Sequence, residues 1–206
     1  MRQKSRSLGR PRQNQTSKPT KTIILDTATK LFIQHGYKIV SMDDVAKECD
    51  ITKATVYYYY STKADLFTDA MVHMMQRIAL RISQILATDA PLKERLYQLV
   101  KIQLSATIDV DMGSFMRDAK THLSDQQLQM MKESEEQMYN AVENVLIEAM
   151  NNGEIPKFDP KFATHSFMSL LNVGNYRDAQ SQSIFPSIDE ATKQIVDFYL
   201  RGLGVH

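Results

Sequence analysis

The sequence predicts an all-α protein of about nine helices, in which a small N-terminal helical unit precedes a larger helical domain. Three features support this fold. Apolar residues recur at the three- and four-residue spacing of amphipathic helices from residue 24 almost to the C-terminus. Ser, Thr and Asp stand before several of these runs, where helix-capping residues are expected. No segment shows the regular alternation of apolar and polar residues that is typical of a strand.

The first 67 residues predict a helix, a short helix, a tight turn, a second short helix and the start of a long helix. The first helix should end at Gly36, which stands where a C-terminal cap belongs. Ser41 and Asp44 form a predicted capping box for the first short helix, and Thr52 is the predicted N-cap of the second. Two short helices joined by a few residues form a helix-turn-helix unit.

After this long helix, the remaining residues predict five further helices. The long helix begins after Ser61 or Thr62 and runs through Leu86, and another helix starts near Pro91. A short helix over 114–123 precedes a long one that the residues SDQQ cap. Two last helices are expected over residues 160–178 and 187–203, separated by SIFPS.

Composition argues against several functional classes. The single cysteine, Cys49, excludes an internal disulfide framework and a zinc site built on several thiolates. The five histidines are dispersed, and no glycine-rich phosphate loop or Gly-x-Ser-x-Gly motif occurs. We therefore expect no metal, no cofactor and no enzymatic activity. No apolar run approaches about 18 residues, so we expect a cytoplasmic protein without a membrane partner.

Charge is distributed unevenly, although the net charge is only +1. The first 67 residues hold 12 of the 25 basic side chains and 6 of the 24 acidic ones, so the remainder of the chain is acidic. A basic N-terminal part on an acidic body indicates a protein that binds a polyanion and has a second, separate domain.

Four consecutive tyrosines, Tyr57 to Tyr60, lie in the second short helix. Consecutive helical residues point about 100° apart, so these four side chains cannot all be buried. Val56 and Tyr60 lie four residues apart and should face inward, which leaves Tyr57 and Tyr58 outward. Taken alone, the run favours an aromatic anchor in a protein interface. Together with the basic N-terminal part and the helix-turn-helix, it favours DNA.

Residues 24–67, ILDTATKLFIQHGYKIVSMDDVAKECDITKATVYYYYSTKADLF, resemble the DNA-binding domain of TetR/AcrR-type bacterial transcriptional regulators. The shared landmarks are an apolar helix ending in F…GY, then DDVA, then TKATVY, then K..L. The later part of the chain resembles this family only in length, helical pattern and the closing YLRGL. The resemblance implies a flexible basic arm (residues 1–20), a DNA-binding domain (residues 21–67) and a ligand-binding and dimerisation domain (residues 68–206).

The resemblance and the helix-turn-helix geometry imply a set of DNA contacts on double-stranded DNA. The second helix of such a unit enters the major groove and presents its N-terminal residues to bases and phosphates. Small and hydroxyl-bearing side chains allow close approach, and lysines meet phosphates. The expected contacts are Ser41, Thr52, Lys53, Ala54, Thr55, Tyr57, Tyr58, Tyr59 and Lys63.

Two positions depart from the pattern of the family. Asp50 stands in the turn where glycine is usual, but Asp tolerates the left-handed conformation better than most residues. Tyr59 and Tyr60 stand where His and then Phe are usual. Tyr60 fits a buried position if its hydroxyl finds a partner. Tyr59 cannot make any contact that the imidazole of the usual histidine makes.

The N-terminal arm contains GRPR, in which Pro11 fixes an extended backbone between Arg10 and Arg12. This segment resembles the core of an AT-hook, whose arginines enter a narrow A·T minor groove. A disordered basic leader that attracts DNA without sequence preference is the alternative, and both interpretations remain open.

The resemblance further implies a small-molecule cavity and a homodimer in the second domain. Twelve methionines, most of them after residue 70, suit an adaptable pocket for a partly apolar effector, although methionine also fills irregular cores. The candidate pocket residues are Phe115, Met116, His122, Tyr139, Met168, Asn172 and Tyr176. The candidate dimer residues, each of which also suits the core of one chain, are Phe162, Phe167, Leu170, Leu171, Ile195, Phe198 and Tyr199.

The sequence thus predicts a ligand-responsive transcriptional repressor that a small-molecule effector releases from a palindromic operator. An all-helical small-molecule carrier or enzyme is one alternative. An activator or architectural DNA binder that uses the arm is another.

Overall fold

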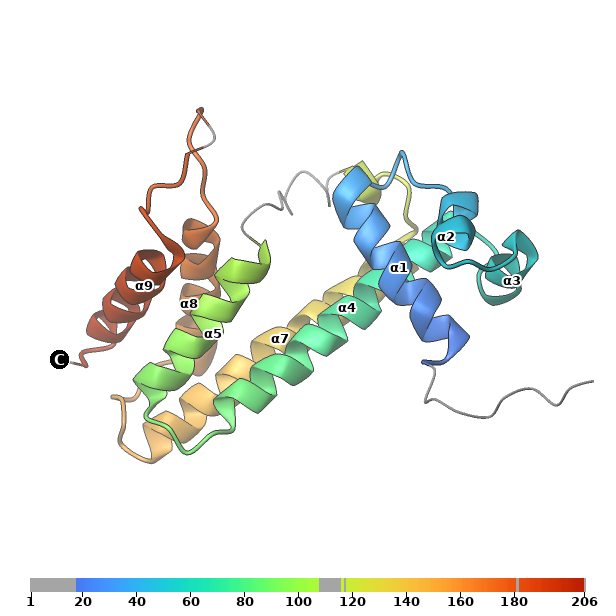
Figure 1. Ribbon diagram of the computed structural model, residues 1–206. Helices are drawn as coiled ribbons and strands as arrows, with labels where there is room; N and C mark the ends of the chain where they lie inside the picture. Colours follow the sequence, from blue (N-terminus) through green and yellow to red (C-terminus); the bar gives the residue numbers. More distant parts are fainter. Residues whose placement is uncertain (1–17, 108–115, 117, 181, 206) are drawn as a thin grey trace, which may run out of the picture.

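The computed structural model describes residues 18–107, 116, 118–180 and 182–205, and these residues are predominantly helical (Figure 1). Residues 116 and 118–120 are helical and lie between α5 and α7. The all-α prediction is confirmed, since β pairing in the described residues is limited to one isolated bridge between Arg177 and Ser183. The helices with described bounds are α1 (Thr20–His35), α2 (Met42–Glu48), α3 (Lys53–Tyr59), α4 (Lys63–Leu86), α5 (Leu92–Thr107), α7 (Asp125–Asn151), α8 (Pro160–Gly174) and α9 (Ile188–Gly202).

The helices form two groups that α4 joins (Figure 1). Helices α1, α2 and α3 gather at one end of the molecule, and we call residues 20–62 the head. Helix α4 runs from the head to the opposite end and packs along α7. Helices α5, α8 and α9 pack on one another and, through α8, on α7, and we call α5, α7, α8 and α9 the body.

The helix starts are encoded by the capping residues that the sequence contains. Ser41 and Asp44 form the predicted capping box: the Asp44 amide donates to Ser41 Oγ at 3.1 Å, and the Ser41 amide donates to Asp44 Oδ2 at 2.8 Å. Thr52 accepts from the Thr55 amide at 3.1 Å, as predicted. Thr62 rather than Ser61 caps α4.

The turn between α2 and α3 depends on Asp50. Its φ of 54° lies in the left-handed region, as the sequence predicts, and it alone among the described non-glycine residues has a positive φ. The amide of Ile51 donates to the Ala46 carbonyl at 3.0 Å, which closes the end of α2. The direction in which α3 leaves α2 therefore rests on one strained residue.

Three aromatic rings form the centre of the head's core. Phe32 and Phe67 meet edge to face with centroids 5.1 Å apart, and Tyr37 meets Phe67 in the same way at 5.0 Å. The core does not end with the head, since Ala119 and Met131 are buried in the same cluster. The start of α4, the segment after α5 and the start of α7 are therefore fixed to the head by apolar burial.

A second apolar core lies in the body. Phe167 and Leu146 are fully buried there, among side chains of α5, α7, α8 and α9. The buried Tyr199 hydroxyl donates to the Ala163 carbonyl at 3.0 Å and ties α9 to α8. Helix α8 ends at Gly174, four residues before the predicted end, and a turn with Asn175 follows it.

In the part of the chain that the structure describes, no helix has the length and apolarity needed to cross a bilayer. The same residues contain no group of three or more His, Cys, Asp and Glu side chains arranged to hold a metal ion.

Replacing Asp50 tests the strain in this turn. Asp50→Gly should be more stable than Asp50→Ala by about 1 kcal/mol, because only the alanine variant keeps a Cβ atom in the left-handed region. Both variants lose the carboxylate, so the comparison isolates the backbone. Urea unfolding followed by circular dichroism measures both. Equal stabilities would show that Asp50 is not strained.

Candidate nucleic-acid interface

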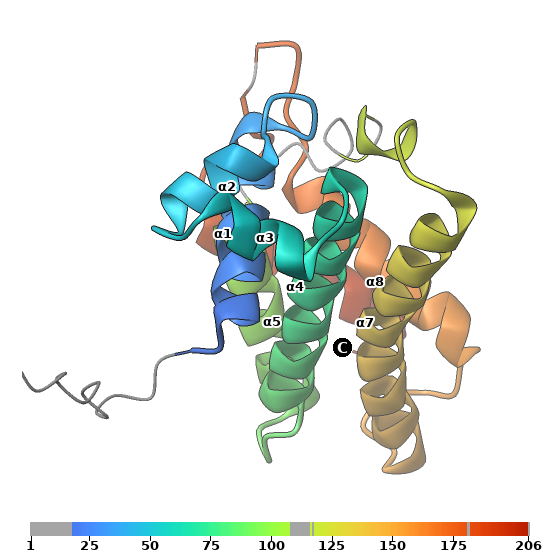
Figure 2. The same ribbon diagram turned by 90° about the vertical axis from the view of Figure 1, so that its right-hand side faces the viewer.

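Helix α3 lies on the outside of the head (Figure 2). Val56 and Tyr60 are buried, as the helical geometry predicts. Tyr57, Tyr58 and Tyr59 are 45%, 83% and 38% exposed. Tyr58 and Tyr59 meet edge to face with ring centroids 5.2 Å apart. Two apolar anchors therefore hold a seven-residue helix that offers three tyrosines to solvent.

The N-terminus of α3 presents small polar groups. Thr52 and Ala54 are exposed, and Thr55 is half-buried. The hydroxyls of Thr52 and Thr55 lie 2.8 Å apart within hydrogen-bonding distance, so the cap and the second hydroxyl form one unit. A helix N-terminus with exposed hydroxyls suits a phosphate or a base edge.

Lys53 is held by a residue that was not among the predicted contacts. Its ammonium donates to the Asp43 carboxylate of α2 at 2.9 Å and lies 5.6 Å from the centroid of the Tyr57 ring. The hydrogen bond to Asp43 raises the pKa of Lys53. Both side chains are more than half exposed, so this pair contributes little stability and is open to exchange with a phosphate.

Lys63 is held more firmly than the sequence suggests. Its ammonium donates to the Lys38 carbonyl at 3.2 Å and lies 4.5 Å above the Tyr37 ring. Burial lowers its pKa. Ser41 is engaged as well, because its hydroxyl donates to Asp44 Oδ2 at 2.6 Å. Arg10 and Arg12 lie outside the described residues.

Tyr60 occupies the buried aromatic position, but its hydroxyl has no hydrogen-bond partner among the described residues. Burial and the nearby Asp69 carboxylate raise the pKa of this hydroxyl. The Lys21 ammonium lies 5.7 Å from the ring centroid. We expected Tyr60 to fit this buried position if its hydroxyl found a partner. No hydrogen bond supplies that partner among the described residues.

Two predicted pocket residues face the head. The His122 ring stacks on Tyr37 with centroids 5.2 Å apart, and Met116 packs against the head's core. Polar contacts join the same parts of the chain: the Gln127 amide donates to Asp65 Oδ1 at 2.9 Å, and Lys38 pairs with Asp118 at 3.6 Å. Residues 116 and 118–131 thus form a joint between the head and the body.

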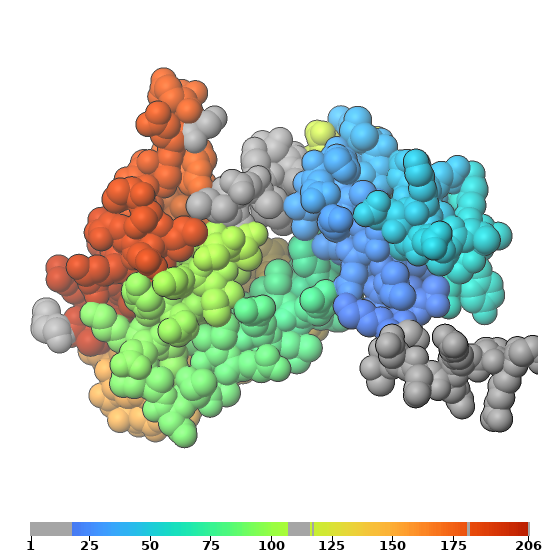
Figure 3. All heavy atoms as spheres, viewed as in Figure 1, coloured from blue at the N-terminus to red at the C-terminus, as the bar shows by residue number. Residues whose placement is uncertain are grey.

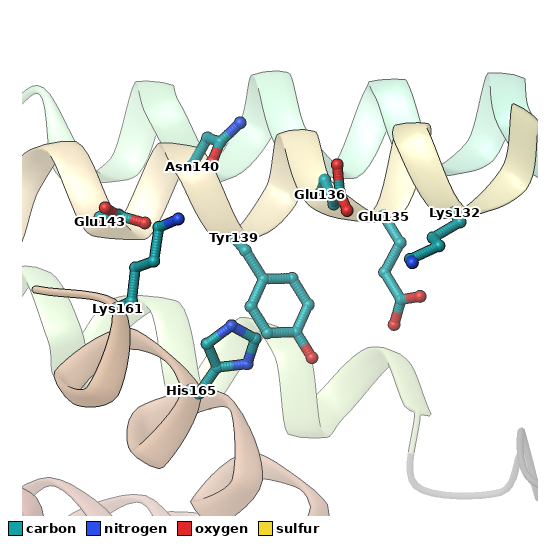
Figure 4. Close-up of a pocket in the computed structure, with 8 residues that line it drawn as sticks. All are labelled: Lys132, Glu135, Glu136, Tyr139, Asn140, Glu143, Lys161 and His165. Carbon is teal, nitrogen blue, oxygen red and sulfur yellow. The ribbon is translucent and has the colours of Figure 1, made fainter. Parts of the chain in front are cut away.

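A surface groove of about 370 Å³ lies between α7 and α8 (Figure 4). Tyr139 and His165 point toward each other in it, with ring centroids 4.8 Å apart. Of the predicted pocket set, only Tyr139 lines this groove, among polar side chains that were not predicted. Its other lining residues are Lys132, Glu135, Glu136, Asn140, Glu143 and Lys161.

The other predicted pocket residues lie apart from one another. Met168 packs against the body core, whereas Asn172 and Tyr176 are exposed. Phe115 lies outside the described residues.

The predicted dimer set divides into exposed and buried members. Phe162 of α8 is 68% exposed and Phe198 of α9 is 69% exposed, whereas Leu170 is partly buried. The other predicted members are buried inside the chain: Phe167, Leu171, Ile195 and Tyr199. Val173 and Tyr176 are further exposed apolar side chains at the end of α8. Exposed apolar side chains that the sequence did not fully identify therefore lie on α8 and α9 and just after α8.

Residues 24–70 match the family model of bacterial regulatory proteins, tetR family. This N-terminal domain belongs to the TetR/AcrR-type family of regulators, so its helix-turn-helix is a DNA-binding unit and the chain is a transcriptional regulator. It is similar to the uncharacterised HTH-type transcriptional regulator YhgD of Bacillus subtilis, with 22% identity over 152 residues, 73% of this chain and 79% of that protein.

Two further proteins show how far the likeness extends. The negative transcriptional regulator IcaR of the Staphylococcus epidermidis biofilm operon is 39% identical over 44 residues, 21% of this chain and 24% of IcaR. The crystal structure of the transcriptional regulator FadR from Bacillus subtilis with stearoyl-CoA has a TM-score of 0.70 at 17% identity and covers 90% of this TetR/AcrR-type chain and 99% of FadR. Because FadR is only 17% identical to this chain, its likeness shows a shared fold. All three are described as transcriptional regulators.

Tyr60→Phe tests whether the buried hydroxyl is a liability of the head. Stability should stay the same or rise by up to about 1 kcal/mol, because the variant removes an unsatisfied polar atom. Tyr199→Phe is the matched control, and it should lose about 1 kcal/mol, since its hydroxyl donates to Ala163. Urea unfolding measures both. A comparable loss in Tyr60→Phe would show that its hydroxyl donates to Asp69.

Proposed function

We propose that this regulator is a homodimeric repressor whose two heads bind the half-sites of a palindromic operator and whose body binds a small-molecule effector. The observation that carries the proposal is the division of α3. Val56 and Tyr60 anchor it, while Thr52, Lys53 and Tyr57 are presented to solvent on a capped helix. This arrangement suits insertion into a major groove.

The proposed contacts fall into two classes. Thr52, Lys53, Lys63 and the α3 amides position the head on phosphates, and Ser41 contributes near the start of α2. Ala54, Thr55 and Tyr58 read base edges or thymine methyl groups, and Tyr57 and Tyr59 flank them. Arg10 and Arg12 of the arm extend the contact into a neighbouring groove. Phosphate contacts make affinity depend on salt, whereas base contacts make it depend on sequence.

Both proposed phosphate lysines already have partners in the structure. Lys53 can exchange Asp43 for a phosphate at little cost, because that pair is exposed. Lys63 is partly buried between a carbonyl and an aromatic ring. We therefore assign Lys53 the larger share of the salt dependence and assign Lys63 mainly to positioning the loop that carries Lys38.

We assign residues 1–20 to a basic arm, 21–67 to DNA binding, and 68–206 to effector binding and dimerisation. Phe162 and Phe198 support dimerisation through α8 and α9, because large apolar side chains so exposed favour burial against a second copy. Leu170 is partly buried and packs against the body core. The buried members of the predicted dimer set then hold α8 and α9 together beneath this surface.

Effector binding is supported by the FadR structure, which contains stearoyl-CoA. The joint formed by residues 116 and 118–131 supplies a route from the body to the head, because Tyr37, Asp65 and the head's core contact it directly. An effector that binds one arrangement of this joint more tightly shifts the separation of the two heads and lowers operator affinity. We assign no catalytic step to the chain.

Substitutions on α3 test the DNA contacts. Tyr57→Phe should weaken binding about fivefold on all sequences if its hydroxyl meets a phosphate, because one hydrogen bond contributes about 1 kcal/mol. Thr55→Val should instead change base preference at one position of each half-site. Gel-shift titrations on the DNA upstream of its own gene and on single-base variants measure both effects.

Native protein that shifts neither this DNA nor neighbouring promoters at low salt would contradict the repressor proposal and favour an effector-binding carrier. Equal effects of both substitutions on all sequences would remove Thr55 from base readout.

Substitution of Phe198 tests the proposed dimer surface. Phe198→Lys should dissociate the dimer and weaken operator binding, since a lysine within an apolar interface leaves a desolvated charge. Leu80→Lys is the matched control, because Leu80 is 65% exposed on α4 and lies outside α8 and α9. Analytical ultracentrifugation measures the mass. A Phe198→Lys protein that remains dimeric would place the interface elsewhere.

A further inference from the structure

A groove of about 520 Å³ lies between the end of α4 and the first turns of α5, opposite the head. This volume is within the range of small-molecule sites. Part of the face that contains these elements is visible in Figure 3, in green. The groove is separate from the one between α7 and α8. Its lining residues are Ile85, Thr88, Ala90, Glu94, Arg95, Tyr97, Gln98 and Ile102.

The groove has an apolar wall and one buried cation. Ile85, Ala90, Tyr97 and Ile102 supply carbon surface from both helices. The side chain of Arg95 is only 8% exposed. A buried guanidinium in an apolar groove requires partners for its N–H groups, so the partners of Arg95 determine what the groove can bind.

Arg95 uses only part of its donor capacity. Its Nη1 donates to the Leu86 carbonyl at 2.9 Å, and its Nη2 donates to Glu154 Oε1 at 3.4 Å. Its Nε is buried and has no hydrogen-bond partner among the described residues. A guanidinium has five N–H donors, and one of them is the Nε–H group. This Nε–H group of Arg95 therefore lacks an acceptor.

The charge of Arg95 is already balanced. Glu154 pairs with it and also accepts from the Leu92 amide at 3.3 Å, which holds the carboxylate at the start of α5. Glu94 adds a second carboxylate at the rim of the groove. A further anion would meet this negative charge, whereas an uncharged oxygen would accept from Arg95 without electrostatic cost.

We propose that this groove binds an uncharged molecule with an apolar body and a carbonyl oxygen, of the ester or lactone class. The apolar body lies along Ile85, Tyr97 and Ile102, and the carbonyl oxygen accepts from the guanidinium of Arg95. The exposed rim side chains, Glu94 and Gln98, turn aside to admit it. The proposal names a ligand class for the body and so rests on the effector-binding part of the proposed function, but binding at this site needs neither DNA nor a second copy of the chain.

Calorimetry on the full chain with γ-decalactone as the probe tests the site, with decanoate as an anion of the same carbon number. The lactone should bind at one site per chain, and decanoate should bind at least about tenfold more weakly. Equal or tighter binding of decanoate would overturn the uncharged class. The absence of lactone binding would overturn the site.

Two variants locate the binding. Gln98→Trp fills the groove from its exposed rim and should weaken lactone binding about tenfold. Ala106→Trp, which places the same ring at an exposed position on α5 away from the lining, should bind as the native chain does. Equal binding by both variants would contradict the assignment of the groove.

Arg95→Lys keeps the positive charge beside Glu154 but removes the Nε–H donor. It should weaken lactone binding about tenfold while its thermal unfolding by circular dichroism remains cooperative. If Arg95→Lys unfolds, Gln98→Trp decides the question. The gel shift without lactone is measured on the same variants. Loss of the gel shift in the absence of lactone would count against the repressor proposal. Loss of lactone binding with an unchanged gel shift concerns the groove alone.

Discussion

The burial of Phe67 among the rings of the head is the contact on which the arrangement of the molecule depends. Phe67 belongs to α4, yet it packs edge to face on Phe32 and Tyr37. Because α4 continues through 24 residues to the far end of the body, its first turns pack into the core of the head and its last turns pack into the core of the body. Any displacement of α4 must therefore either move the head as a unit or break a densely packed apolar contact, and tight packing favours the first.

Local patterns predicted much of the fold, and long-range contacts account for the rest. The caps at Ser41, Thr52 and Ser124 and the left-handed Asp50 follow from a few neighbouring residues, so the sequence specifies them. The inward position of Val56 and Tyr60 follows from helical periodicity. The pairing of Asp43 with Lys53, the stacking of His122 on Tyr37 and the clustering of Tyr139 with His165 join residues 10 to 85 positions apart. No periodicity in one segment contains that information.

The cations near α3 show why residue type alone is a weak guide to a binding site. Lys53 lies four residues before the tyrosine run and Lys63 three residues after it, but their environments differ. The exposed Lys53 keeps its charge beside an equally exposed carboxylate, whereas burial against Tyr37 lowers the pKa of Lys63. A phosphate competes easily with a solvated ion pair and poorly with a partly buried ammonium that a carbonyl and a ring already hold. The roles that we propose for the two lysines therefore differ, and the difference rests on tertiary contacts.

The two ends of α4 are fixed by different kinds of interaction. At the head, aromatic packing and the Asp65–Gln127 hydrogen bond hold its first turns. At the far end, Arg95 binds the Leu86 carbonyl and Glu154, so a single buried guanidinium joins the end of α4, the start of α5 and the connection after α7. Apolar packing resists displacement in every direction, whereas hydrogen bonds from a guanidinium can be redistributed among acceptors without loss of burial. The far end of α4 is therefore where a small molecule that supplies one further acceptor can alter the geometry of the helix most readily.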